Sequence, residues 1–214
     1  MTEYTAKKDI YTKKIKELLS RLNKQNLIVK NQINLIVFDD EFNYRRVQSI
    51  NGIDFRAKPG VTNVFVTHQD NKFASCKCFA LTYDNLAFID KSQHVLSGLL
   101  IDLGSKSTLY IDRDLSCGGI EIRLREHHDV LIGEDCMFSS NISIWTSDGH
   151  AIFDKEGKLI NVGGDVIIGD HVWVGHGVKF LKKTFINNDS VVGSSSLVTK
   201  QFSEKKYNYC WIPS

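Results

Sequence analysis

The segment from Ser143 to Asn161 holds the side chains of this sequence that are best suited to proton transfer. His150 lies within it, and an imidazole has an unperturbed pKa of about 6.5, so it can accept a proton at neutral pH. The neighbouring Asp148, Asp154 and Glu156 are much weaker bases unless they are strongly desolvated. The residue types therefore predict His150 as the base of this segment.

Two other histidines, His171 and His176, are five residues apart, a spacing that suggests a metal site. They fall in different phases of the sequence repeat described below, so their side chains need not point together. His127 and His128 are two turns of that repeat away, and no third ligand is evident. We therefore expect no metal.

The five cysteines form no CxxC pair, which favours a reduced cytoplasm over a disulfide framework. Cys136 occupies an inward position of the repeat, and nothing supports a reactive thiolate there or at Cys117. The N-terminus lacks the apolar region of a signal peptide, and the apolar run Leu35–Phe38 is too short to span a membrane. We expect a cytoplasmic protein.

Apolar residues recur at every sixth position in the C-terminal part of the chain. Gly or Asn often follows such a residue, as a turn with positive φ requires, and a small or β-branched residue often comes four positions after it. Two inward residues in six fit short strands joined by tight corners, three of which make one coil of a triangular solenoid. The series is Ile168, Val174, Phe180, Ile186, Val192 and Val198.

The same phase includes Ile132, Phe138 and Ile144 and would resume at Val162. The slots at 150 and 156 between them hold His and Glu, which are unsuited to a core. We therefore interpret residues 147–161 as a loop pushed outward from the solenoid.

Two further series of apolar residues recur upstream with a period of about 22 residues. They predict that the solenoid begins near residues 30–50. Each coil covers the open edge of its neighbour, and the end coils need caps. One series is Val66, Phe88, Ile111 and Ile132, and the other is Phe55, Cys78, Ile101, Ile122 and Ile144.

The N-terminal residues 1–30 carry eight Lys or Arg and three acidic residues, a net charge of +5, whereas the whole chain has +2. Apolar residues at 11, 15, 18 and 22 predict an amphipathic helix, with the lysines mostly on its other face. We expect this helix to cap the β-structure, with residues 31–214 forming the solenoid domain. The alternative is a basic surface that contacts an anionic membrane, as a peripheral protein of the inner membrane would, or an anionic polymer.

Four motifs carry a resemblance to a known family. The chain resembles the hexapeptide-repeat acyltransferases, and among them the bacterial surface-polysaccharide O-acetyltransferases, most strongly from Asp129 to Ser214. The motifs are TSDGHAIFD (146–154), KLIN (158–161), VIIGDHVWVG (166–175) and VVGSSSLVTK (191–200).

This resemblance implies an all-β fold, a left-handed parallel β-helix with an extruded active-site loop. It also implies a homotrimer that binds acetyl-CoA in a groove between two solenoids. By position in the loop, His150 is the general base that takes the proton from an acceptor hydroxyl. Asp148 would orient the imidazole or bind the acceptor, and Trp173 would wall the acyl and acceptor site.

The resemblance also implies the residues that contact coenzyme A, chiefly through backbone amides and a few cationic side chains near its 3′-phosphate. The chain departs from the family where Lys182-Lys183 replaces Lys-Gly, so the turn there is built without glycine. It departs again in the segment Cys210–Ser214, since the basic residue that the family has after the position of Ser214 is missing. The candidate contacts are Gly175, His176, Lys182, Ser194, Ser195, Lys200 and Trp211.

The sequence thus favours an acetyl-CoA-dependent O-acetyltransferase that acts on a glycan or sugar acceptor of the bacterial surface (capsule or lipopolysaccharide) or on its precursor. No nucleic-acid partner is expected. Three alternatives stay open: an N-acetyltransferase on an amino-sugar nucleotide, a γ-type zinc hydratase on the same solenoid, and a non-catalytic scaffold. Zinc content separates the hydratase, and thiol release from acetyl-CoA separates the scaffold.

Overall fold

The strands of the chain form three sheets that enclose one long apolar core. A computed structural model describes residues 2–203 and 209–210. The first sheet contains, in spatial order, β2 (Tyr44–Arg46), β1 (Ile33–Phe38), β4 (Asn63–His68), β7 (Asn85–Ile89), β10 (Thr108–Ile111), β13 (Val130–Ile132), β16 (Val166–Ile168), β19 (Phe185–Ile186) and β22 (Gln201–Phe202).

The other two sheets have seven strands each, and every pair within them is parallel. The second sheet contains β3 (Ile53–Ala57), β6 (Cys76–Ala80), β9 (Leu99–Asp102), β12 (Ile120–Arg123), β15 (Ile142–Trp145), β18 (Lys179–Phe180) and β21 (Leu197–Val198). The third contains β5 (Lys72–Ala74), β8 (Val95–Ser97), β11 (Ser116–Cys117), β14 (Met137–Phe138), β17 (Trp173–Val174), β20 (Val191–Val192) and β23 (Tyr209–Cys210).

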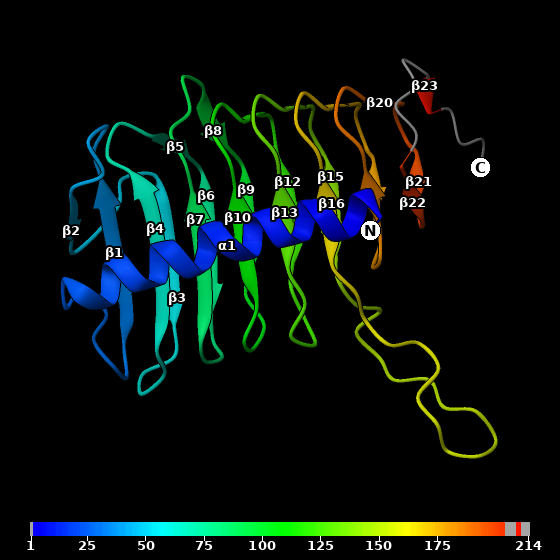
Figure 1. Cartoon of the computed structure of the whole chain (residues 1–214), viewed down its shortest axis with the longest axis horizontal. Helices are drawn as coiled ribbons and strands as arrows, with labels where there is room; N and C mark the ends of the chain where they lie inside the picture. The colour runs from blue at the N-terminus through cyan, green and yellow to red at the C-terminus, as the bar shows by residue number, and fades with distance from the viewer. Residues whose placement is uncertain (1, 204–208, 211–214) are drawn as a thin grey trace.

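This arrangement confirms the predicted β-solenoid. Each coil contributes one strand to each sheet, and the coils stack along the long axis of the molecule (Figure 1). All six residues of the hexad series from Ile168 to Val198 are at most 2% exposed. The series from Phe55 to Ile144 is also confirmed, because its members pair with one another in register across the second sheet.

The series predicted to end at Ile132 is wrong at one step. Phe88 pairs with Tyr110, whereas Ile111 pairs with Ile89. A shift of one residue moves a side chain to the opposite face of a sheet. Both faces of the first sheet are apolar here, so the alternation that would have revealed the correct register is missing.

Helix α1 (Glu3–Lys24) explains why both faces of the first sheet are apolar. It runs along the outer face of this sheet, across most of the stack (Figure 1), with Thr2 as its N-cap. Its buried residues Tyr11, Leu18 and Leu22 pack against outward side chains of the sheet, including Ile36, Val66, Phe88, Tyr110, Leu131, Ile167 and Phe185.

The expectation that the helix caps an end of the solenoid is therefore wrong. Continuous apolar strands need cover on both faces, and an amphipathic helix placed at an end would have left the outer face of the first sheet in water. At the N-terminal end of that sheet the short strand β2 instead pairs antiparallel with β1.

The charge of the helix is also arranged differently from the expectation. Three of its lysines reach back to carboxylates of the solenoid: Lys7 lies 2.5 Å from Asp170, Lys14 lies 2.6 Å from Asp112, and Lys8 pairs with the buried Asp165. These lysines fix the helix to the sheet, so the outer face is less basic than the sequence suggests. No helix in the described part of the chain has the length and apolar character needed to cross a membrane.

Replacing Leu22, which is fully buried under the helix, tests this attachment. Leu22→Ala should lower the free energy of unfolding by about 2–5 kcal/mol, because it removes core contacts and leaves a cavity. Chemical denaturation measures the change. Ile10→Ala is the matched control, since Ile10 lies on the same helix but is 53% exposed, and equal effects of the two changes would contradict the packing described here.

Candidate functional site

The predicted loop leaves the solenoid at one corner, between β15 and β16, and extends away from the stack (Figure 1). The coils on either side keep their register, because Ile132 pairs with Ile168 and Ile144 with Phe180. The outward loop at 147–161 is thus confirmed. Val162 is not the next inward residue, as the spacing suggested, for it is 45% exposed and belongs to the returning arm of the loop.

Glu126, in the preceding coil, ties the two arms of the loop together where they leave the solenoid. Its Oε1 accepts a hydrogen bond from the Ser147 hydroxyl, and its Oε2 accepts one from the Gly163 N–H at 2.8 Å. The bond from Ser147 and that from Gly163 hold the pKa of the Glu126 carboxyl below its usual value. The carboxylate therefore remains charged, and remains an acceptor for both arms, at neutral pH.

Asn161 forms a second tie further out along the loop. Its Nδ2 donates to the His150 carbonyl at 2.7 Å and to Asp148 Oδ2 at 2.9 Å, and its Oδ1 accepts from the Ile152 N–H at 2.7 Å. Lys182 Nζ adds hydrogen bonds to Asp148 Oδ2 at 2.5 Å and to the Asn161 carbonyl at 2.7 Å. The backbone that carries His150 is therefore held on both sides.

These contacts revise two expectations about the site. Lys182, a candidate contact of coenzyme A, is only 19% exposed and is engaged by the loop. Asp148 is held by Lys182 and Asn161, which lower the pKa of its carboxyl. No hydrogen bond among the described residues joins Asp148 to the His150 imidazole. Asp148 thus shapes the loop around His150 in this chain, and the exposed imidazole stays open to other groups.

The turn at Lys182-Lys183 is built without glycine, as the sequence indicates. Lys183 itself takes the left-handed conformation, with φ of 66°. Gly164 makes room for it on the adjacent coil, because a Cβ there would lie 2.2 Å from the Lys183 side chain. Gly164 on the adjacent coil therefore provides the space that the turn at Lys183 requires.

Four of the candidate donor contacts lie together at the corners that follow β17 and β20. The N–H of Ser195 donates to the His176 carbonyl at 2.7 Å. Gly175 allows the two coils to approach, since a Cβ there would lie 2.6 Å from the Ser194 nitrogen. Trp173 is close in sequence to this corner and is 55% exposed. These four candidate contacts of coenzyme A thus lie together on one surface.

The remaining candidates lie apart from this group. Lys200 is exposed near Phe202, with its Nζ 5.9 Å from the centre of the ring. Trp211 lies outside the described residues. No hydrogen bond or ion pair within residues 2–203 joins His150 to Trp173 or to the serines. Within the described chain, the His150 imidazole is therefore not linked by a polar contact to the corners after β17 and β20.

The two histidines considered for a metal have different partners. His171 lies 3.3 Å from Asp189 and 3.6 Å from Asp135, whereas His176 Nδ1 is 3.0 Å from the Ser140 hydroxyl. Burial raises the pKa of the described cysteines, to about 11 at Cys117 and about 12 at Cys136. These two thiols are therefore poor nucleophiles, in agreement with the sequence.

Comparison with known proteins places this geometry among acetyltransferases, although no protein-family model matches the chain. A polysialic acid O-acetyltransferase of Neisseria meningitidis is 42% identical over 86 residues, which is 40% of this chain and 40% of that protein. One from Escherichia coli is 33% identical over 114 residues, 52% of this chain and 36% of that one. A galactoside O-acetyltransferase of Lactococcus lactis is 31% identical over 83 residues.

Two solved structures share the fold. A polysialic acid O-acetyltransferase matches with a TM-score of 0.57 at 26% identity, over 71% of this chain and 81% of that one. A polySia-specific acetyltransferase matches with a TM-score of 0.50 at 22% identity. The chain spans less than half the length of the curated relatives it matches. These similarities confirm the resemblance to hexapeptide-repeat acetyltransferases of the capsule branch.

Asn161→Ala tests the tie that holds the loop. Amide hydrogens of the loop, in particular that of Ile152, should exchange faster, because Asn161 Oδ1 accepts the Ile152 N–H. The melting temperature should change by less than about 2 °C, since the loop lies outside the core. Lys158→Ala, at the exposed loop tip, serves as the control. Unchanged exchange in Asn161→Ala would show that this side chain does not order the loop.

Proposed function

We propose that this protein is an acetyl-CoA-dependent O-acetyltransferase that acetylates a hydroxyl of a capsule glycan, polysialic acid or a polymer like it. The observation that supports this most strongly is the loop: a regular solenoid is interrupted once by a long excursion that presents His150. The relatives named above are O-acetyltransferases by their descriptions, which supports the same class of reaction here.

In the proposed reaction, the His150 imidazole accepts the proton of the acceptor hydroxyl. The oxygen attacks the thioester carbonyl of acetyl-CoA, and the coenzyme A thiolate leaves and is protonated. A base of this kind contributes about 10²–10⁴-fold to the rate. The raised pKa values of the buried cysteines favour this direct transfer over an acetyl-cysteine intermediate.

The donor would lie along the corners after β17 and β20. The backbone there is exposed at Ser194 and Ser195, and Gly175 keeps the adjacent coil close. Lys200 and the exposed face of Trp173 are the side chains offered to the phosphates and to the acyl group. Lys182 is better assigned to the loop, because its ammonium is already bound by Asp148 and Asn161.

A homotrimer would bring the His150 loop and these donor corners together. The loop carries apolar side chains that are more than half exposed, Ile152, Phe153 and Ile160, and the third sheet exposes Met137 beside Trp173. Exposed apolar surface of this kind marks an interface. In a closed C3 assembly, the loop of one subunit would cover the donor corner of the next.

His150→Ala should lower kcat/KM for acetyl transfer by about 10²–10⁴-fold, because it removes the base. The melting temperature and the affinity for coenzyme A should stay close to wild type, since the imidazole is exposed and has no partner among the described residues. His94→Ala, an exposed histidine on an upstream coil, is the control. A folded His150→Ala that keeps more than about a tenth of wild-type kcat/KM would rule out His150 as the base.

Light scattering should give three times the chain mass of 24.3 kDa for the wild type. Met137→Asp should shift the mass toward the monomer and lower activity, because it places a charge on the exposed apolar column of the third sheet. Lys155→Asp at the loop tip should change neither. A wild-type monomer with full activity would contradict the proposed assembly.

A further inference from the structure

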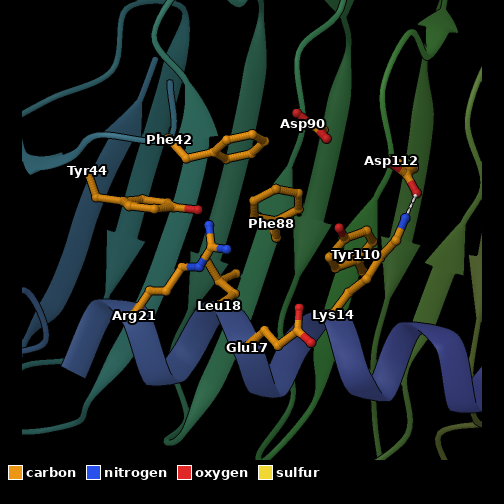
Figure 2. Close-up of a pocket in the computed structure, with 10 residues that line it drawn as sticks. All are labelled: Lys14, Glu17, Leu18, Arg21, Phe42, Tyr44, Phe88, Asp90, Tyr110 and Asp112. Atoms are coloured by element: carbon orange, nitrogen blue, oxygen red, sulfur yellow. Dashed lines mark hydrogen bonds and ion pairs between the residues drawn. The ribbon is translucent and has the colours of Figure 1, made fainter. Parts of the chain in front are cut away.

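A concave site lies away from the loop, between helix α1 and the outer face of the first sheet. Figure 2 shows this cavity, which has a volume of about 330 Å³. Strands β7 and β10, the segment before β2, and the helix all contribute to its walls. The residues that line it include Glu17, Arg21, Phe42, Tyr44, Phe88 and Asp90.

The floor of the cavity continues a ladder of stacked aromatic rings. The rings of Phe88 and Tyr110 are 4.7 Å apart, those of Phe38 and Phe88 are 5.5 Å apart, and those of Phe38 and Phe42 are 5.8 Å apart. The planes within each pair lie within 21° of parallel. The ladder ends at Phe42, which is half exposed at the rim.

Phe42 is held at this rim by a strained backbone. Its φ is 60°, a conformation that is rare for a bulky side chain. The carboxylate of Asp39 fixes the turn by accepting the N–H groups of Glu41 and Asn43, at 3.0 and 2.9 Å, and the Asn43 side chain. The turn thus presents an aromatic face to solvent.

The polar groups of the cavity are only partly engaged. Lys14 pairs with Asp112, but Arg21 has no ion pair among the described residues, and it lies over the Phe42 ring at 5.9 Å. Within the described part of the chain, the Asp90 carboxyl accepts only the N–H of Lys91, and burial raises its pKa. The Arg21 guanidinium also lies beside the Tyr44 hydroxyl, but it carries further N–H groups. The cavity therefore offers remaining donors and acceptors above an aromatic floor.

We propose that this cavity binds one pyranose unit of the acceptor glycan, away from the reacting end. The C–H face of the sugar would pack on Phe42 and Phe88. Its hydroxyls would donate to Asp90 and Glu17 and accept from Arg21 and the Tyr44 hydroxyl. The cavity is at the lower end of the size range of small-ligand sites, which suits a single sugar unit.

Other ligands fit this surface less well. An acyl chain would cover the rings but leave Arg21 and Asp90 without partners. An inorganic anion would use Arg21 but would leave the aromatic floor uncovered. A sugar satisfies both kinds of polar group and the aromatic faces at once.

The inference rests on the proposed function only in taking the sugar as part of the acceptor. A polymer bound both here and at the His150 loop is held at two points, so losing this site should weaken long acceptors only. Short acceptors reach the loop alone, and their kinetics should not change.

The test uses Phe42→Gly and Arg21→Gln in the full chain. Glycine relieves the left-handed backbone at 42, so that variant should fold with an unchanged melting temperature. Saturation-transfer NMR and calorimetry with sialic acid oligomers, and separately with maltohexaose as a neutral sugar, measure binding. We expect one of the two sugars to bind the wild type and to bind both variants at least tenfold more weakly, with the KM for long acceptors raised at least tenfold.

Tyr83→Ala and Lys24→Gln are the matched controls, an exposed aromatic and a cation outside the cavity, and should bind as the wild type does. If neither sugar binds the wild type, or if both variants bind as tightly as it does, the site is refuted. If the wild type binds sugar through these residues but transfers acetyl to no glycan, the sugar site stands and the proposed function fails.

Discussion

The parallel, in-register pairing between successive coils is the constraint on which the rest of this structure depends. Each inner strand bonds to the coil before and the coil after, so extra residues can enter only at a corner. The long loop of this chain follows that constraint. The loop leaves between β15 and β16, and Ile144 still pairs with Phe180 across it. The solenoid thus provides a rigid base, and His150 is placed on a segment free of that register.

The inner face of the solenoid could be predicted from the sequence, whereas its outer face could not. The hexad from Ile168 onward marks inward residues because its period of six is strict, even though Ile167 and Phe185 beside it are apolar and face the helix. In the first sheet Phe88 and Ile89 are both apolar and both buried, one against the helix and one in the core. Periodicity cannot separate two buried faces, which is why the register there was misassigned by one residue and the helix was placed at an end.

Some residues of the candidate site could likewise be predicted from the sequence, and others could not. His150 and the donor corner follow from motifs, and Asn161 closes one of those motifs. Glu126 carries no such signal, because its role depends on contacts with Ser147 and Gly163, 21 and 37 residues away. The resemblance assigned Lys182 to the donor, but its ammonium binds Asp148 on the loop. The cavity beside the helix could not be predicted from the sequence either, because its walls come from segments that are far apart in the chain.

The position of helix α1 has a consequence for the order in which the chain is built. Its first turns contact the coils made last: Glu3 binds Asn187, Tyr4 binds Asp165 and Lys7 binds Asp170, across 161 to 184 residues of sequence. The helix leaves the ribosome before these coils, yet it can dock fully only after they have formed. Stacked repeats usually couple only to their neighbours. Because helix α1 spans the stack, it couples early and late coils into one cooperative unit. It also makes the completion of folding slower.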